Sequence, residues 1–130
     1  MIGLTVQIDD RMQSVVSAAE EAAFRNFGHG AARISKDAKA SLEKADGPSE
    51  PGEPPHTHQG AFLRRGVRYA ADKESAVIGP MASIVGESGS AHELGGEYRG
   101  QLFPLRPFMR PALEKNLSRF QSDWAGSIGE

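Results

Sequence analysis

Three prolines fall within eight residues near the end of the chain, at Pro104, Pro107 and Pro111. Proline lacks a backbone N–H and has a fixed φ, so the stretch up to Arg110 is predicted to be an extended strap. Pro111 suits the first turn of a helix, where the missing N–H costs no hydrogen bond. The strap also carries apolar residues that a disordered linker would lack, namely Phe103, Leu105 and Phe108. We therefore expect the strap to lie against a core or a neighbouring subunit.

Length and composition narrow the class of protein. A chain of 130 residues suits one domain spanning 1–130. The absence of cysteine excludes disulfides, thiolate catalysis and the common structural zinc sites, and fits a reducing cytoplasm. No apolar run approaches the roughly 20 residues of a membrane helix, and the start resembles no secretion signal, so no membrane association is expected. The formal charge of -2 gives no overall attraction to nucleic acid.

The N-terminal residues alternate between apolar and polar side chains from Ile2 to Asp9, which predicts a half-buried strand. Asp10, with Gln13 three positions on, resembles a helix N-cap, so a long helix is expected from there to about Lys44. Apolar residues then recur every three or four positions, at Val16, Ala19, Ala23, Phe27, Ile34, Ala38 and Leu42. This pattern predicts one buried stripe. Gly28 and Gly30 are expected to mark a bend or a close approach.

The middle of the chain is predicted to contain a loop and a hairpin. Residues 46–59 hold four prolines and two glycines, which predicts a mobile loop. After a helical or turn-like stretch at 61–65, residues 67–71 and 76–79 alternate around the polar residues 72–75, which predicts a β-hairpin.

The C-terminal third is expected to return to the sheet and end in a helix. Residues 81–85 extend the strand or form another, and 87–91 form a turn. His92 to Gly96 is interpreted as a strand end followed by a tight turn, because paired glycines supply positive φ. A closing helix is predicted to bury Leu113, Leu117, Phe120 and Trp124. The expected fold is α+β: a long N-terminal helix and a C-terminal helix packed on a small, mostly antiparallel sheet.

The histidines are the candidate metal ligands, with Glu53 or Glu93 as added carboxylates. His56 and His58 lie in the proline-rich loop, however, and no helical ligand pair holds them rigidly. On a strand, His92 and Glu93 would point to opposite faces and could not act together as acid and base. We therefore expect no metal, no cofactor and no catalysis, and interpret Glu53, His56 and His58 as loop contacts to a partner.

A basic cluster at Arg64, Arg65 and Arg68 could bind phosphates or an acidic partner surface. A solvated face with ion pairs is the alternative interpretation, because acids such as Glu97 and Glu114 are interspersed further on. A small DNA-binding adaptor that uses residues 64–73 is accordingly the second functional hypothesis.

Five motifs occur in a characteristic order from residue 52 onward: Gly52-Glu53-Pro54-Pro55, Gly60-Ala61-Phe62-Leu63-Arg64-Arg65, Val77-Ile78-Gly79-Pro80, His92-Glu93-Leu94-Gly95-Gly96, and Arg106-Pro107-Phe108-Met109-Arg110-Pro111-Ala112-Leu113. In this order they resemble the head-tail joining proteins of tailed phages and prophages, also called tail-completion or minor tail proteins. The resemblance spans roughly residues 48 to 114. One departure is Arg65-Gly66-Val67, where the family often has a small residue and an aliphatic one.

The resemblance implies a structural virion protein at the neck or upper tail, which joins or completes the tail for attachment to the head. It further implies a homo-oligomeric ring, expected to be a hexamer, that contacts tail tube and head connector proteins and meets DNA only in passage. Before assembly such a protein lies in the host cytoplasm. Interface contacts are then expected along the strap, at Arg106, Pro107, Phe108, Arg110 and Pro111. Phe108 suits either a core or an interface position.

Overall fold

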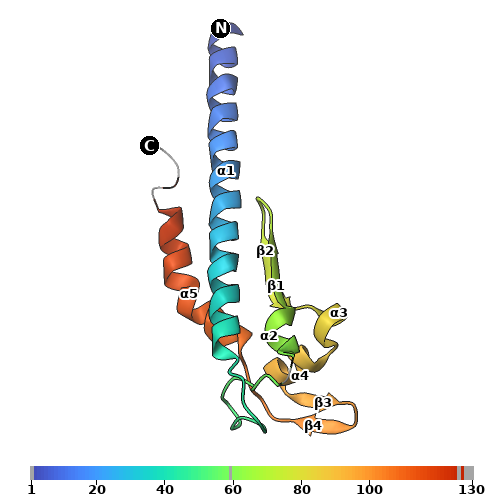
Figure 1. Cartoon of the computed structure of the whole chain (residues 1–130). Helices are drawn as coiled ribbons and strands as arrows, with labels where there is room; N and C mark the ends of the chain where they lie inside the picture. The colour runs from blue at the N-terminus through green and yellow to red at the C-terminus, as the bar shows by residue number, and fades with distance from the viewer. Residues whose placement is uncertain (1, 59, 126, 128–130) are drawn as a thin grey trace.

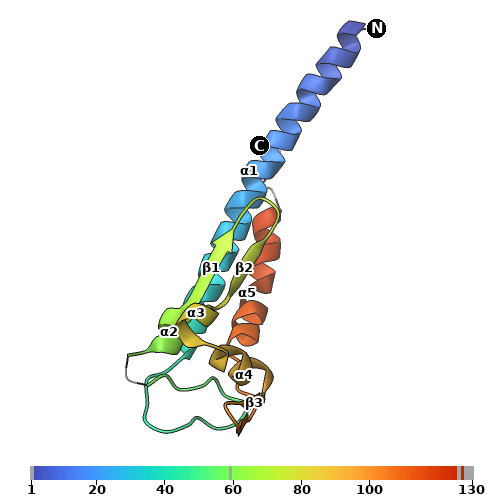
Figure 2. The same cartoon turned by 90° about the vertical axis from the view of Figure 1, so that its right-hand side faces the viewer.

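The computed structural model describes residues 2–58, 60–125 and 127, with side chains from Arg11 onward. A single long helix, α1 (Ile2–Ser41), forms the axis of the molecule, and the other elements gather around its C-terminal half (Figures 1 and 2). A C-terminal helix and two small antiparallel sheets complete the fold. The predicted α+β class is confirmed.

The predicted N-terminal strand is wrong, because residues 2–10 continue α1 and Asp10 is no helix start. No described strand lies beside this segment, and a strand without a partner leaves its backbone groups unpaired. Extending an existing helix adds one hydrogen bond for each residue fixed, whereas the costly step is nucleation. The helix therefore runs through the alternating pattern.

The predicted hairpin is confirmed. A short helix, α2 (Phe62–Gly66), leads into β1 (Val67–Ala71), which pairs antiparallel with β2 (Ala76–Pro80). The Asp72 carboxylate accepts hydrogen bonds from the backbone N–H groups of Glu74 and Ser75 at 2.7 and 2.8 Å, which fixes the turn. These bonds hold the pKa of Asp72 below its usual value. The hairpin lies along α1.

Two helices replace the strand and turn expected after the hairpin. Residues 82–85 form α3 (Ala82–Val85), and 88–94 form α4 (Ser88–Leu94), so His92 and Glu93 lie on a helix and not at a strand end. Close packing explains α4 despite its weak helix formers: a Cβ on Gly89 would lie 2.5 Å from Pro80. The positive φ values expected at Gly95 and Gly96 are present, at 70° and 117°.

The chain then makes a small hairpin, β3 (Gly96–Tyr98) with β4 (Gln101–Phe103), before the strap. Residues 104–107 have no regular structure, and α5 (Met109–Trp124) follows, with Pro111 in its first turn as predicted. α5 packs antiparallel to the lower half of α1 (Figure 1).

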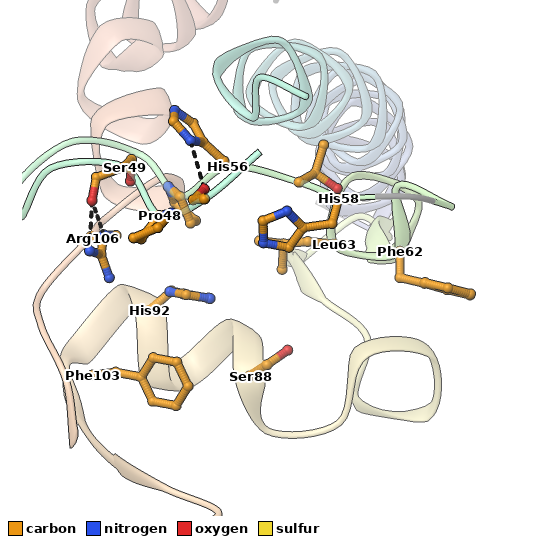
Figure 3. A pocket seen from close by; sticks show the side chains of 13 residues that line it. Pro48, Ser49, His56, His58, Phe62, Leu63, Ser88, His92, Phe103 and Arg106 are labelled. Atoms are coloured by element: carbon orange, nitrogen blue, oxygen red, sulfur yellow. Dashed lines mark hydrogen bonds between the residues drawn. The ribbon is translucent and has the colours of Figure 1, made fainter. Parts of the chain in front are cut away.

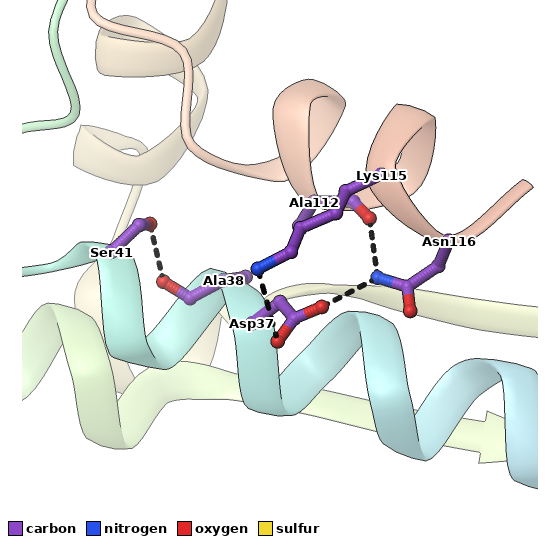
Figure 4. A network of polar contacts seen from close by, with 6 residues as sticks. All are labelled: Asp37, Ala38, Ser41, Ala112, Lys115 and Asn116. Carbon is purple, nitrogen blue, oxygen red and sulfur yellow. Dashed lines mark hydrogen bonds and ion pairs between the residues drawn. The ribbon is translucent and has the colours of Figure 1, made fainter.

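The face that α5 buries differs from the prediction. Ala112 and Asn116 are its buried residues, whereas Leu113 and Leu117 are 43% and 41% exposed. The Asn116 amide donates to the Asp37 carboxylate of α1 at 2.7 Å, and Figure 4 shows this network. The buried residues of α5, Ala112 and Asn116, each precede by one position the leucines that were expected to be buried. The contact with α1 therefore includes a polar pair, Asn116 and Asp37, in place of part of the apolar stripe.

Higher up the helix pair the packing is aromatic. Phe27 of α1 contacts the rings of Phe120 and Trp124, at centroid distances of 5.7 and 5.5 Å. A Cβ on Gly30 would lie 2.8 Å from the Phe120 ring, so the close approach expected here is confirmed, while Gly28 has nothing within 4 Å. The main core lies lower, and its buried members are Ile34, Ala38, Leu42, Leu63, Val67, Phe108 and Ala112.

Candidate functional site

The strap, loop 46–58 and α4 meet at the lower end of the molecule, and this junction contains most of the residues predicted to be functional. Its first component is Glu93 at the end of α4. The carboxylate of Glu93 accepts hydrogen bonds from the backbone N–H groups of Phe108, Met109 and Arg110, at 2.8, 2.9 and 2.9 Å. Glu93 therefore caps the N-terminus of α5, which has no side-chain cap of its own.

Arg106 is the second component and ties the strap to the loop. Its guanidinium is buried and donates from Nε and Nη2 to the Ser49 carbonyl oxygen, at 2.9 and 2.6 Å. Its backbone N–H donates to the His92 carbonyl oxygen, and the Gly52 N–H donates to the Leu105 carbonyl oxygen. Arg106 thus acts inside the chain, where an interface contact was expected.

The loop is anchored at both ends. A backbone bridge joins Lys44 to Thr57, and the Thr57 N–H donates to the Glu43 carbonyl oxygen at 2.8 Å. Pro55 and Thr57 are fully buried. Mobility of the loop in solution stays a prediction, and Gln59 lies outside the described residues. Glu53 is exposed and does not line the cavity described next.

A cavity of about 490 Å³ lies between the loop, α2, α4 and the strap (Figure 3). It brings His56 and His58 of the loop together with His92, which lies far from them in the sequence, and with Arg106. The remaining lining residues are small, hydroxylic or apolar: Gly47, Pro48, Ser49, Pro55, Thr57, Phe62, Leu63, Ser88 and Phe103. Sequence reasoning missed this convergence, because it placed His92 on a strand.

Local contacts set the orientation of each histidine. The Nδ1 atoms of His56 and His58 lie 3.2 Å from the carbonyl oxygens of Gly47 and Ala45. The ring of His92 packs edge-on against Phe103, with centroids 5.2 Å apart. Burial, the charge of Arg106 and nearby His58 together lower the pKa of His92. His92 is therefore held mainly neutral near pH 7.

The remaining predicted interface residues separate into two groups. Phe108 is completely buried in the core of its own chain, so of its two expected positions the core is the observed one. Pro107 is half-buried. Arg110 and Pro111 are exposed at the start of α5, where Arg110 pairs with Glu114 at 3.3 Å.

The predicted basic cluster does not form one exposed patch. Arg64 is half-buried and donates to the Leu42 carbonyl oxygen at the end of α1. Arg65 lies over the Phe62 ring, 5.4 Å from its centroid. Arg68 is exposed on β1. Of the three arginines, Arg64 therefore stabilises the fold, because it connects α2 to the end of α1.

The N-terminal half of α1 is the largest feature that the sequence interpretation missed. Above Glu20, which pairs with Lys73 of the hairpin, the helix projects without a neighbour among the described elements (Figure 2). Met12 and Val15 on this part are 57% and 55% exposed, and Val16 is also exposed. The apolar stripe therefore continues past the body that covers it lower down.

The described residues also bear on two other classes of function, metal binding and membrane insertion. Among them no three histidine, aspartate or glutamate side chains gather as a metal-binding group. None of the described helices has the length and apolar character needed to cross a membrane. Comparisons with protein-family models, with curated proteins and with solved structures gave no match.

Proposed function

We propose that this chain is a structural protein at the neck or upper tail of a tailed-phage particle, where it joins or completes the tail for attachment to the head. The proposal begins from the ordered motifs between residues 52 and 113. In this role the protein catalyses no reaction and acts as one subunit of a closed ring, expected to be a hexamer.

The exposed upper half of α1 is the observation that carries the proposal. Residues 2–19 extend the helix by about 27 Å at 1.5 Å per residue. Its exposed Met12, Val15 and Val16 continue the stripe that α5 and the hairpin cover below. A helix that is apolar on one face is stabilised by burying that face, and the neighbouring subunit of a ring offers the surface to do so.

The hairpin supports the same arrangement. β1 and β2 pair only with each other among the described residues, so each has an edge with unpaired backbone groups. Val77, on the face of β2 that points away from α1, is exposed. Open strand edges join readily to strands of another subunit. A ring in which α1 of one subunit covers the hairpin region of the next would bury both surfaces.

The test introduces a charge into the exposed stripe. Val16→Glu places a carboxylate on the stripe, and Ser17→Glu places the same group on the opposite side of the same helix. We expect wild type and S17E to form rings by analytical ultracentrifugation and to give joined particles by electron microscopy. V16E is expected to be monomeric and to leave separate heads and tails. Joined particles at normal yield from a phage that carries only V16E would refute the proposal.

The dispersal of the arginines gives no comparable support to a DNA-binding adaptor. The same protein preparations distinguish the two functions, because an adaptor would bind DNA with an affinity that falls steeply as salt rises.

A further inference from the structure

We propose that the cavity between loop 46–58, α4 and the strap binds a carboxylate group carried on an apolar body. This site is separate from the exposed stripe of α1, so the proposal goes beyond structural joining and its test is independent of assembly. It combines three observations: the charge of the lining, the unused polar groups in its walls, and the apolar surfaces between them.

The ionisable residues that line the cavity are all basic. The lining contains Arg106 and three histidines, and none of its residues is acidic. Asp46, Glu50 and Glu87 are sequence neighbours of lining residues, but all three are exposed and none lines the cavity. Glu93, the neighbour of His92, is engaged by the backbone of α5. A buried guanidinium without a counter-charge is costly, and an anion placed beside it relieves that cost.

Not all hydrogen-bond donors in the cavity walls are used by bonds within the chain. The bonds of Arg106 to Ser49 use Nε and Nη2, which leaves Nη1, with two N–H groups, for a ligand. Buried side-chain atoms without a hydrogen-bond partner include Thr57 Oγ1, Ser49 Oγ and His92 Nδ1, all on residues of this cavity. These three atoms have almost no exposed surface, so Nη1 of Arg106 is the group that we expect to bind the ligand. A planar carboxylate matches the geometry of the guanidinium.

His92 makes the site respond to pH. Burial, the charge of Arg106 and nearby His58 lower its pKa, and a bound anion would offset the effect of the charge. Carboxylate binding therefore takes up protons.

The apolar walls define the rest of the ligand. Phe103 and Leu63 line the cavity together with Pro48 and Pro55. A volume of about 490 Å³ lies within the usual range for small-molecule pockets. A bare ion would leave these walls in contact with water, whereas an aromatic or aliphatic acid covers them.

The probe is benzoate, with benzamide as the neutral ligand of equal shape. Titration calorimetry with the full chain is expected to detect benzoate, and to find benzamide at least roughly tenfold weaker, the ratio expected for losing a charged hydrogen bond. Between pH 7.5 and 5.5 the affinity for benzoate should rise by roughly tenfold, as expected for one linked proton. Equal binding of the two probes, or no binding of benzoate, would overturn the proposal.

Two histidine variants localise the effect. His92→Gln should remove most of the pH dependence, whereas His29→Gln, which changes the exposed histidine on α1, should leave it intact. If H92Q does not fold, NMR of the wild-type histidines gives the same information: benzoate should raise the pKa of His92 and leave the ring signals of His29 unchanged. A benzoate effect of equal size at His29 would mean nonspecific binding and would contradict the assignment.

A second pair of probes identifies the source of the carboxylate. A short peptide ending in phenylalanine with a free C-terminus is compared with the same peptide amidated. Tighter binding of the free peptide than of benzoate would indicate the chain end of a partner protein. Tighter binding of benzoate would indicate a small organic acid, and failure of both carboxylates would refute the site.

Discussion

Replacing Glu93 by alanine should lower the free energy of unfolding by about 3 kcal/mol. The Glu93 carboxylate is the acceptor for three successive backbone N–H groups at the start of α5. In the variant these donors have no partner, and the strap no longer has a fixed junction with α4. The effect should therefore be large for a single charged residue outside the core.

The magnitude follows from three contributions that overlap. Losing a side-chain N-cap costs about 0.5–2 kcal/mol. Hydrogen bonds to a charged group contribute about 1.5–3 kcal/mol each, and two of the donors, the N–H groups of Phe108 and Met109, are partly buried. The negative charge also interacts favourably with the helix dipole, by about 0.3–1 kcal/mol. Because all three describe the same carboxylate, they do not add in full.

Urea denaturation followed by circular dichroism measures this loss. Glu93→Gln keeps one acceptor oxygen but loses the charge, so it should cost about half as much as E93A. Glu97→Ala removes an exposed carboxylate on β3 and serves as the control, with an expected change within about 0.5 kcal/mol. A decrease below about 0.5 kcal/mol for E93A would refute the capping role.

Three further predictions follow from the packing and from the histidine. Phe108→Ala should lower the free energy of unfolding by about 3–5 kcal/mol in urea, because the ring is fully buried; an unchanged stability with lost joining would place it at an interface instead. Gly30→Ala should lower the melting temperature, since its Cβ would meet the Phe120 ring, whereas Gly28→Ala should raise stability by about 0.5–1 kcal/mol. Because the pKa of His92 is lowered in the folded state, the unfolded chain binds more protons, so stability measured in urea should fall as pH drops below about 6.5, and H92Q should flatten this slope.

Local pattern was enough to predict part of the fold. The β1–β2 hairpin follows from two alternating runs around a polar turn, and the start of α5 follows from Pro111. Both depend on neighbours in the sequence, which a periodicity argument can use. A bend or a close approach was expected at Gly28 and Gly30, because a glycine inside a helix needs a packing explanation, and the close approach is found at Gly30.

Tertiary contacts decided the parts that the sequence did not predict. Alternation at residues 2–9 is typical of a strand, but a strand also needs a partner, and no pattern shows whether one is present. The serine- and glycine-rich segment of α4 has weak helix propensity, and its helix is supported by Ala91 and Gly89, which are buried. Asn116 is buried because Asp37 lies opposite, a pairing across 79 residues.

The structure places several of the predicted site residues at one junction. His56 and His58 line a cavity together with His92, which was assigned to a strand end and lies on α4, and their contact with a partner stays a prediction. Arg106 was expected at an interface, and its guanidinium binds Ser49 of the same chain. Residue type indicated that these positions matter, while the distances between them exist only in the folded chain.

The helical placement of His92 and Glu93 also explains why two separate motifs occur together in this sequence. On a strand these neighbours would point to opposite faces, and the second would have no defined partner. On α4 one turns to the cavity and the other to the first turn of α5, 15 to 17 residues later in the chain. The His92–Gly96 motif and the strap motif are therefore connected in the fold, because the Glu93 carboxylate of the first accepts hydrogen bonds from backbone N–H groups of the second. A substitution at Glu93 should consequently change the position of the strap, the shape of the cavity and the packing of Phe108 together. This makes Glu93 the most informative residue to mutate.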